Sequence, residues 1–134
     1  MQAIDSNIWA YALDATVPEH QRAARAVGKA LEGDVLVNTA VQMEVAHYLV
    51  KRLGAAAGKD AADDFLALPL TVDPLDPPLG RDSLRLLVRY TDIGIGGRDA
   101  TLLASMQRHR VVRILTHDAT FGRVDWVEAV DPIA

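Results

Sequence analysis

Apolar residues follow two different patterns along the chain. Short runs rich in Val, Ile and Leu predict buried strands, and longer segments in which apolar residues recur every three or four positions predict helices. The predicted strands cover residues 1–4, 35–37, 70–72, 111–116 and 127–130, with the third and the last as edge strands. The predicted helices cover residues 7–13, 18–31, 39–53, 60–68, 81–90 and 99–110.

The alternation of strands with helices predicts the fold class. Such an order is typical of α/β proteins, in which helices cover both faces of a parallel sheet. We therefore expect a three-layer α/β/α sandwich with a mostly parallel central sheet of about five strands. The length of 134 residues predicts one domain over residues 1–134, and a domain of that size buries roughly 68–70% of its unfolded surface.

Local signals indicate where the helices begin and which faces they bury. Thr39 and Gln42 have the spacing of a capping box, which predicts that Thr39 caps the helix at 39–53. Residues 54–58 are rich in glycine and alanine and are interpreted as a turn. In the helix at 81–90, the residues expected to face the core are Leu84, Leu87 and Val88.

Composition limits the classes of function. The chain has no cysteine, which excludes disulfides and thiolate metal sites and agrees with a cytoplasmic location. No apolar run approaches the ~20 residues that a bilayer requires, so no membrane association is expected. Lys and Arg number 14 against 18 Asp and Glu, a net charge of −4. Any contact with nucleic acid must therefore be local or assisted by metal.

Acidic residues stand where ligands bind in parallel sheets. Asp5 follows the first predicted strand and Asp118 follows the strand at 111–116, and ligands of open α/β sheets bind at the carboxyl ends of the strands. Asp99 lies within the apolar stripe of its helix, and Glu44 borders the apolar stripe of the helix at 39–53. Taken singly, each acid is equally typical of a helix cap, a turn or a solvated surface position.

As a set, the four acids predict a metal site. Two unit charges ~4 Å apart repel by roughly 4 kcal/mol at an effective dielectric constant of ~20, so a carboxylate cluster needs protons or a cation. Carboxylate oxygens suit Mg²⁺ or Mn²⁺ better than zinc, whose sites usually include histidine or cysteine. The chemistry of such ions is activation of water for attack on phosphorus and stabilisation of charge on the phosphate.

Four segments of the chain resemble the PIN-domain nucleases, in particular the VapC-type toxins of prokaryotic toxin–antitoxin pairs. They are Ile4-Asp5-Ser6-Asn7, Thr39 with Glu44 five residues later, Asp99-Ala100-Thr101-Leu102-Leu103-Ala104, and Leu115-Thr116-His117-Asp118-Ala119-Thr120-Phe121. The resemblance extends over nearly the full length, and its strength lies in the order and separation of the four segments.

The resemblance implies a metal-dependent endoribonuclease that binds Mg²⁺ or Mn²⁺. Asp5 and Asp99 would be the principal ligands, with Glu44 and Asp118 completing the site directly or through water. Asn7 and Thr116 would order the ligands or the substrate. Some relatives carry a further acid where this chain has Thr120, which bears on a second metal.

The resemblance also implies partners. These are an RNA substrate, a second copy of the chain in a homodimer, and a small VapB-type antitoxin. The C-terminal segment of such an antitoxin blocks the site, often with an arginine.

Other residues near the acids have two interpretations each. Arg98 and Arg123 flank two of the proposed ligands and are candidates to bind RNA phosphates, although solvated arginines are equally typical of a surface.

The glycines at 94 and 96 match part of a dinucleotide fingerprint, but the third glycine and the preceding strand are absent.

Two other classes of function remain open. A phospho-aspartate receiver or phosphatase-like domain also places acids at strand ends, but no lysine of this chain lies on a late predicted strand. A catalytically inert PIN-fold interaction module would keep the fold and bind no metal.

Overall fold

A parallel β-sheet organises the chain in the computed structural model, which describes residues 1–134. Its strands are β1 (Gln2–Ile4), β2 (Val35–Asn38), β3 (Thr71–Asp73), β4 (Arg113–Leu115) and β5 (Glu128–Val130). Their order is β3-β2-β1-β4-β5, and every neighbouring pair is parallel. The predicted sheet of about five strands is confirmed, with β3 and β5 at its two edges as expected.

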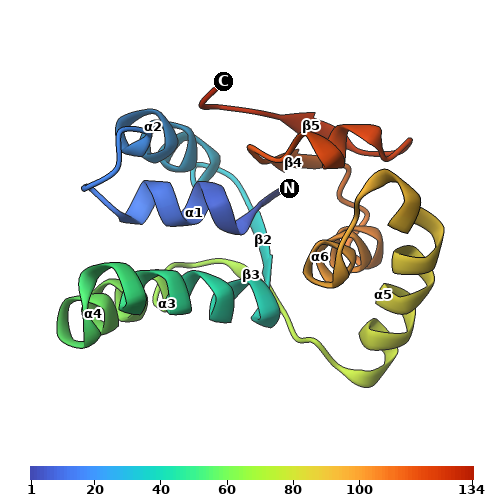
Figure 1. Cartoon of the computed structure of the whole chain (residues 1–134), viewed down its shortest axis with the longest axis horizontal. Helices are drawn as coiled ribbons and strands as arrows, with labels where there is room; N and C mark the ends of the chain where they lie inside the picture. Colours follow the sequence, from blue (N-terminus) through green and yellow to red (C-terminus); the bar gives the residue numbers. More distant parts are fainter.

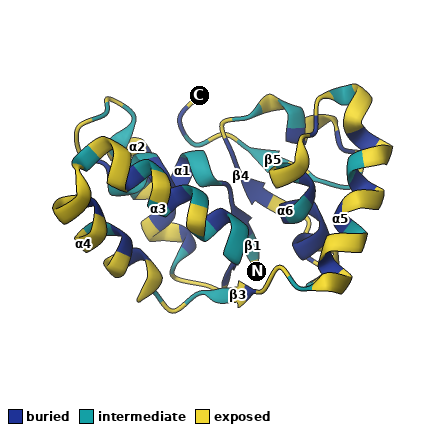
Figure 2. Ribbon diagram, turned by 60° about the horizontal axis from the view of Figure 1, so that its bottom comes forward, coloured by how far each residue is buried: buried dark blue, intermediate teal, exposed yellow.

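Helices cover both faces of the sheet, which confirms the predicted three-layer arrangement. In Figure 1 the first four helices lie on one side of the strands and the last two on the other, and Figure 2 shows the same division. The helices are α1 (Ser6–Leu13), α2 (His20–Ala30), α3 (Thr39–Leu53), α4 (Ala55–Leu66), α5 (Pro77–Tyr90) and α6 (Gly97–Arg108), with short 3₁₀ helices η1 (Thr91–Ile93) and η2 (Ala119–Arg123). None of them is long and apolar enough to cross a bilayer.

The central strands form the middle of the core. All four residues of β2 are buried, and so are Ala3 and Ile4 of β1. On the α1 face, Trp9 packs its ring against Phe65 of α4 with the ring centroids 4.9 Å apart. Burial of each large apolar side chain contributes about 1.5–3 kcal/mol, so this packing holds β1 and its carboxyl end in a fixed place.

The start of α3 differs from the capping-box prediction. Asn38, the last residue of β2, is the N-cap, and its side-chain oxygen accepts a hydrogen bond from the amide of Val41 at 2.8 Å. The Thr39 hydroxyl instead accepts from the amide of Leu75 at 3.0 Å. Asn38 keeps the extended backbone of the strand, which is the conformation an N-cap requires, so the helix begins immediately after the strand.

The interpretation of residues 54–58 as a turn is wrong. The chain reverses at Gly54 alone, which has φ +90°, and α4 begins at Ala55. Such a backbone conformation favours glycine, which has no Cβ to clash. Gly58 is also needed, because a Cβ there would lie 2.5 Å from the carbonyl oxygen of Leu49. The glycines therefore allow α3 and α4 to pack closely.

The predicted inward face of α5 is wrong for two of its three residues, since only Leu87 is half-buried against the core. Leu84 and Val88 are 61% and 70% exposed, whereas Leu79, Ser83, Leu86 and Tyr90 are buried. The Ser83 hydroxyl donates to the carbonyl oxygen of Leu79 at 2.7 Å, so this polar residue is tolerated inside. Because Ser83 is polar, the row of residues that faces the core could not be recognised as apolar in the sequence.

Candidate functional site

Asp5 occupies the carboxyl end of the central strand β1. Its backbone amide donates to the carbonyl oxygen of Leu115 at 2.9 Å, which continues the pairing with β4. One carboxylate oxygen accepts from the amide of Ser6 at 2.7 Å and so caps α1, and the other accepts from the Thr116 hydroxyl at 2.8 Å. With 6% exposure, the Asp5 carboxylate is buried and held at both oxygens.

Thr116 connects Asp5 to Asp118. The buried Thr116 hydroxyl donates to Asp5 and accepts from the amide of Asp118 at 3.0 Å. The Asp118 carboxylate itself accepts from the amide of Thr120 at 2.9 Å and caps η2. Asp5 and Asp118 therefore both cap helices, which is the role expected of each acid taken singly. They do so at the carboxyl ends of neighbouring strands.

Asp99 lies in the first turn of α6, but it is not the N-cap, which is Gly96. Burial raises the pKa of Asp99 to about 6, and the negative charges of Asp5, Asp118 and Glu44 act in the same direction. A hydrogen bond with the backbone of Gly96 opposes the shift. Asp99 is therefore within electrostatic reach of the other three acids, at the start of α6.

Glu44 approaches the same place from α3. Its side chain is 27% exposed, and Oε1 lies 2.5 Å from Nη1 of Arg98. Burial raises the pKa of Asp5, and the hydrogen bonds from Thr116 and Ser6 oppose this increase. The negative charge of Glu44 raises the pKa of Asp5 further. Asp118 acts on Asp5 in the same direction as Glu44.

The four predicted acids thus share one electrostatic environment, although they come from four separate segments. No group of three or more His, Asp or Glu side chains lies close enough together to form a ready metal-binding cage. The donor set nevertheless fits a divalent cation such as Mg²⁺ or Mn²⁺, because it consists of carboxylate oxygens, and their mutual repulsion adds to burial in raising the pKa of Asp99. A bound cation would reduce this repulsion between the carboxylates.

The remaining predicted residues lie around the acids with different contacts. The side-chain oxygen of Asn7 accepts from the amide of His117 at 3.4 Å, and the His117 ring contacts Asp131 with 2.8 Å between Nδ1 and Oδ2. Arg98 is engaged by Glu44. Arg123, in contrast, is exposed and makes no ion pair.

Asn38 is a site residue that the sequence reasoning missed. Besides capping α3, its fully buried amide donates to Thr101 at 3.3 Å and to Ser105 at 3.2 Å on α6. It therefore ties the helix that carries Glu44 to the helix that carries Asp99. A polar residue at the end of an otherwise apolar strand is the signal that could have identified it.

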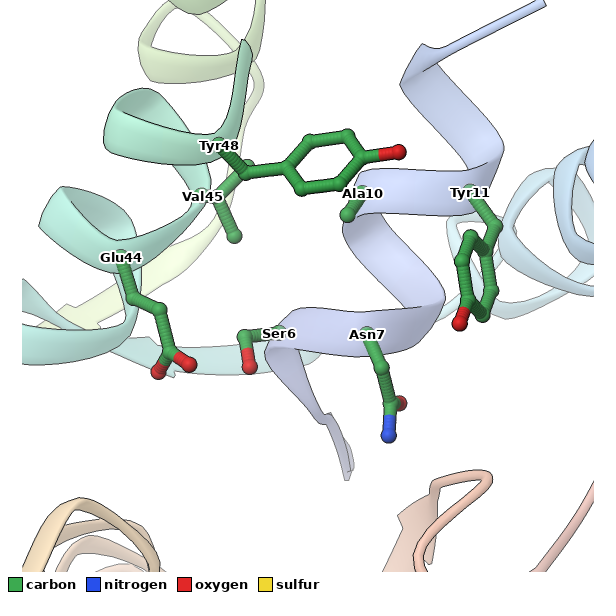
Figure 3. Close-up of a pocket in the computed structure, with 7 residues that line it drawn as sticks. All are labelled: Ser6, Asn7, Ala10, Tyr11, Glu44, Val45 and Tyr48. Carbon is green, nitrogen blue, oxygen red and sulfur yellow. The ribbon is translucent and has the colours of Figure 1, made fainter. Parts of the chain in front are cut away.

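A cavity of about 200 Å³ opens beside Glu44, between α1 and α3. Figure 3 shows the ring of Tyr48 extending from α3 towards α1. Its hydroxyl donates to the fully buried Asp14 at 2.8 Å, and burial together with this bond raises the pKa of Tyr48 to about 12. The lining residues are Ser6, Asn7, Ala10, Tyr11, Glu44, Val45 and Tyr48.

A five-stranded parallel sheet between helical layers, with acids at its carboxyl edge, defines an α/β/α domain with a candidate metal site. A family model of the PIN domain matches residues 3–127, and the chain belongs to this family. No curated protein matches the sequence significantly.

Solved structures of toxin–antitoxin proteins share the fold. VapC20 from Mycobacterium tuberculosis, described as a Sarcin-Ricin loop cleaving toxin, is 23% identical with a TM-score of 0.81, over 96% of this chain and 98% of that one. FitAcB from Neisseria gonorrhoeae is 20% identical with a TM-score of 0.75, over 98% of each chain. A toxin–antitoxin complex from Klebsiella pneumoniae is 19% identical with a TM-score of 0.72, again over 98% of each chain.

Proposed function

We propose that residues 1–134 form one PIN-like nuclease domain that hydrolyses RNA phosphodiester bonds with a divalent metal, as the toxin of a toxin–antitoxin pair. The observation that carries the proposal is the placement of Asp5 and Asp118 at the ends of neighbouring strands, joined through the Thr116 hydroxyl, with Asp99 and Glu44 within electrostatic reach of Asp5 or Asp118. Membership of the PIN family and the folds of the toxin neighbours support it.

Asp5 and Asp99 are the proposed principal ligands of Mg²⁺ or Mn²⁺, with Glu44 and Asp118 completing the set. When bound, such an ion lowers the pKa of water and stabilises charge on phosphate oxygens. The protein's own part is orientation. Thr116 holds one oxygen of Asp5 at 2.8 Å and leaves the carboxylate little freedom to rotate. The exposed Arg123 is the proposed contact for a neighbouring RNA phosphate.

The partners follow from the same proposal. We propose a VapB-type antitoxin as the inhibitor, because the solved neighbours include toxin–antitoxin complexes and a basic peptide suits a locally acidic region of the surface. We also propose a cytoplasmic homodimer. The exposed Leu84 and Val88 of α5, at 61% and 70%, support the existence of a contact surface.

The test is incubation of the purified protein with total tRNA and rRNA, with and without Mn²⁺, followed by mapping of the RNA ends. We expect cleavage only with metal, and we expect Asp5→Asn and Asp99→Asn each to abolish it while circular dichroism shows an intact fold. Asp64→Asn, at an exposed position of α4, is the matched control. Full activity in either site variant would refute the proposal.

The alternatives receive no support from particular contacts. The lysines that a receiver domain would need lie on α2, α3 and α4, and Lys59 pairs with Asp63 at 2.6 Å. An inert interaction module predicts a melting temperature that millimolar Mn²⁺ leaves unchanged, whereas a cation that binds only the folded chain raises it.

A further inference from the structure

Arg98 forms an ion pair across the group of acids. It is the second residue of α6, immediately before Asp99, and its Nη1 lies 2.5 Å from Oε1 of Glu44 on α3. The guanidinium therefore occupies an oxygen of one proposed metal ligand while its backbone adjoins another. It makes no ion pair with any other carboxylate.

The two partners of this ion pair differ in freedom. The Glu44 side chain is 27% exposed, whereas the Arg98 side chain is 70% exposed. The Arg98 backbone is fixed, since its carbonyl oxygen accepts from the Thr101 hydroxyl at 2.7 Å. The guanidinium can therefore leave Glu44 by rotation of its own side chain alone.

The position of Arg98 is unfavourable for a cation without that partner. The first turn of a helix carries the positive end of the macrodipole, where acidic side chains are favoured and basic ones are disfavoured. A residue that breaks a local rule of this kind is expected to have a function that compensates for it. The contact with Glu44 compensates for the unfavourable position of the Arg98 charge. If another cation binds Glu44, the Arg98 guanidinium needs a second anion.

We propose that Arg98 competes with the divalent metal for Glu44 and, once displaced, binds a phosphate of the RNA. The proposal rests on the metal-dependent function proposed above. A guanidinium and a metal ion cannot share Glu44 without repulsion. A freed guanidinium has a planar fork of donors that matches a phosphate. Arg98 thus keeps the acids partly neutralised in the empty site and contacts substrate in the loaded one.

The first test measures Mn²⁺ affinity by isothermal titration calorimetry, without RNA. Arg98→Gln removes the competitor, so we expect the dissociation constant for Mn²⁺ to fall by roughly three- to tenfold, the scale of a partly exposed ion pair and the repulsion that goes with it. The matched control is Arg85→Gln, which removes the same charge and a surface ion pair with Asp82 on α5. Its affinity should equal that of the parent protein.

A double-mutant comparison separates competition from repulsion at a distance. With Glu44→Gln in place there is no carboxylate to compete for, and Arg98→Gln should then change the dissociation constant by less than about twofold. An equal gain in affinity with and without the Glu44 carboxylate would overturn the proposed competition. An unchanged affinity in the single Arg98→Gln variant would overturn it as well.

The second test separates metal binding from RNA binding. In RNA cleavage at saturating Mn²⁺, Arg98→Gln should raise KM several-fold with kcat changed little, because a phosphate contact is lost while the metal ligands remain. An unchanged KM would overturn the phosphate role. If the parent protein binds no Mn²⁺ at all, both the proposed function and this inference fail. If the parent binds Mn²⁺ and Arg98→Gln leaves the dissociation constant unchanged, only this inference is refuted.

Discussion

Asp99→Asn is expected to abolish cleavage and yet to stabilise the metal-free protein. The Asp99 carboxyl has a pKa of about 6 in the folded chain, against an ordinary value of 3.8. The folded chain therefore holds this proton more tightly than the unfolded chain, and stability decreases as the pH rises from about 4 through about 6. The full difference corresponds to roughly 3 kcal/mol at 1.36 kcal/mol per pH unit. Because Asp99 is partly exposed, we discount this to about 1–2 kcal/mol.

The asparagine variant lacks this charge and nearly keeps the shape of the side chain. At pH 7.5 in EDTA we expect its free energy of unfolding in urea to exceed that of the parent by the same ~1–2 kcal/mol, and its Tm to be about 3–8 °C higher. The advantage should shrink steadily as the pH is lowered towards 4. Millimolar Mn²⁺ should reverse the order, because it binds the parent protein more tightly.

The matched control for this stability series is Asp64→Asn, an exposed acid of α4. It alters the net charge equally, and its stability should follow that of the parent at every pH. A less stable Asp99→Asn variant at pH 7.5, or a difference that does not depend on pH, would refute the claim that burial and the neighbouring acids disfavour the Asp99 charge in the folded chain.

Three further substitutions test the supports of the site. Thr116→Val leaves a buried oxygen of Asp5 without its donor, so urea unfolding should show a loss of about 1–3 kcal/mol, with Thr116→Ser close to the parent. Asn38→Ala removes the cap of α3 and two bonds to α6, for a loss of about 2 kcal/mol by the same measurement; Asn38→Ser keeps a capping oxygen and should fall between. Gly58→Ala forces a Cβ to 2.5 Å from a backbone oxygen of α3, which should cost about 1–3 kcal/mol. The control is Gly28→Ala, which lies in open space on α2 and should raise stability by up to ~1 kcal/mol in parallel thermal melts. An unchanged stability of Gly58→Ala would contradict the close packing of α3 and α4.

Much of the fold was predictable because buried parallel strands and amphipathic helices have different apolar periods. The five strands fall within or beside the predicted ranges, and β3 and β5 lie at the edges as expected. The helix starts were less predictable. Whether Asn38 or Thr39 caps α3 depends on where the strand pairing ends, and the inward face of α5 depends on which neighbour the helix meets.

The sequence by itself determined the chain positions of Asp5 and Asp118, since each follows an apolar run that predicts a buried strand, and the alternation of such runs with helices predicted the parallel sheet. Only the tertiary structure decided the environment of these acids. The hydrogen bond from Thr116 to Asp5 joins residues 111 positions apart, and the contact of Arg98 with Glu44 joins two helices. Local periodicity carries no information on such contacts, because burial, charge and hydrogen bonding between distant segments exist only once the layers have packed.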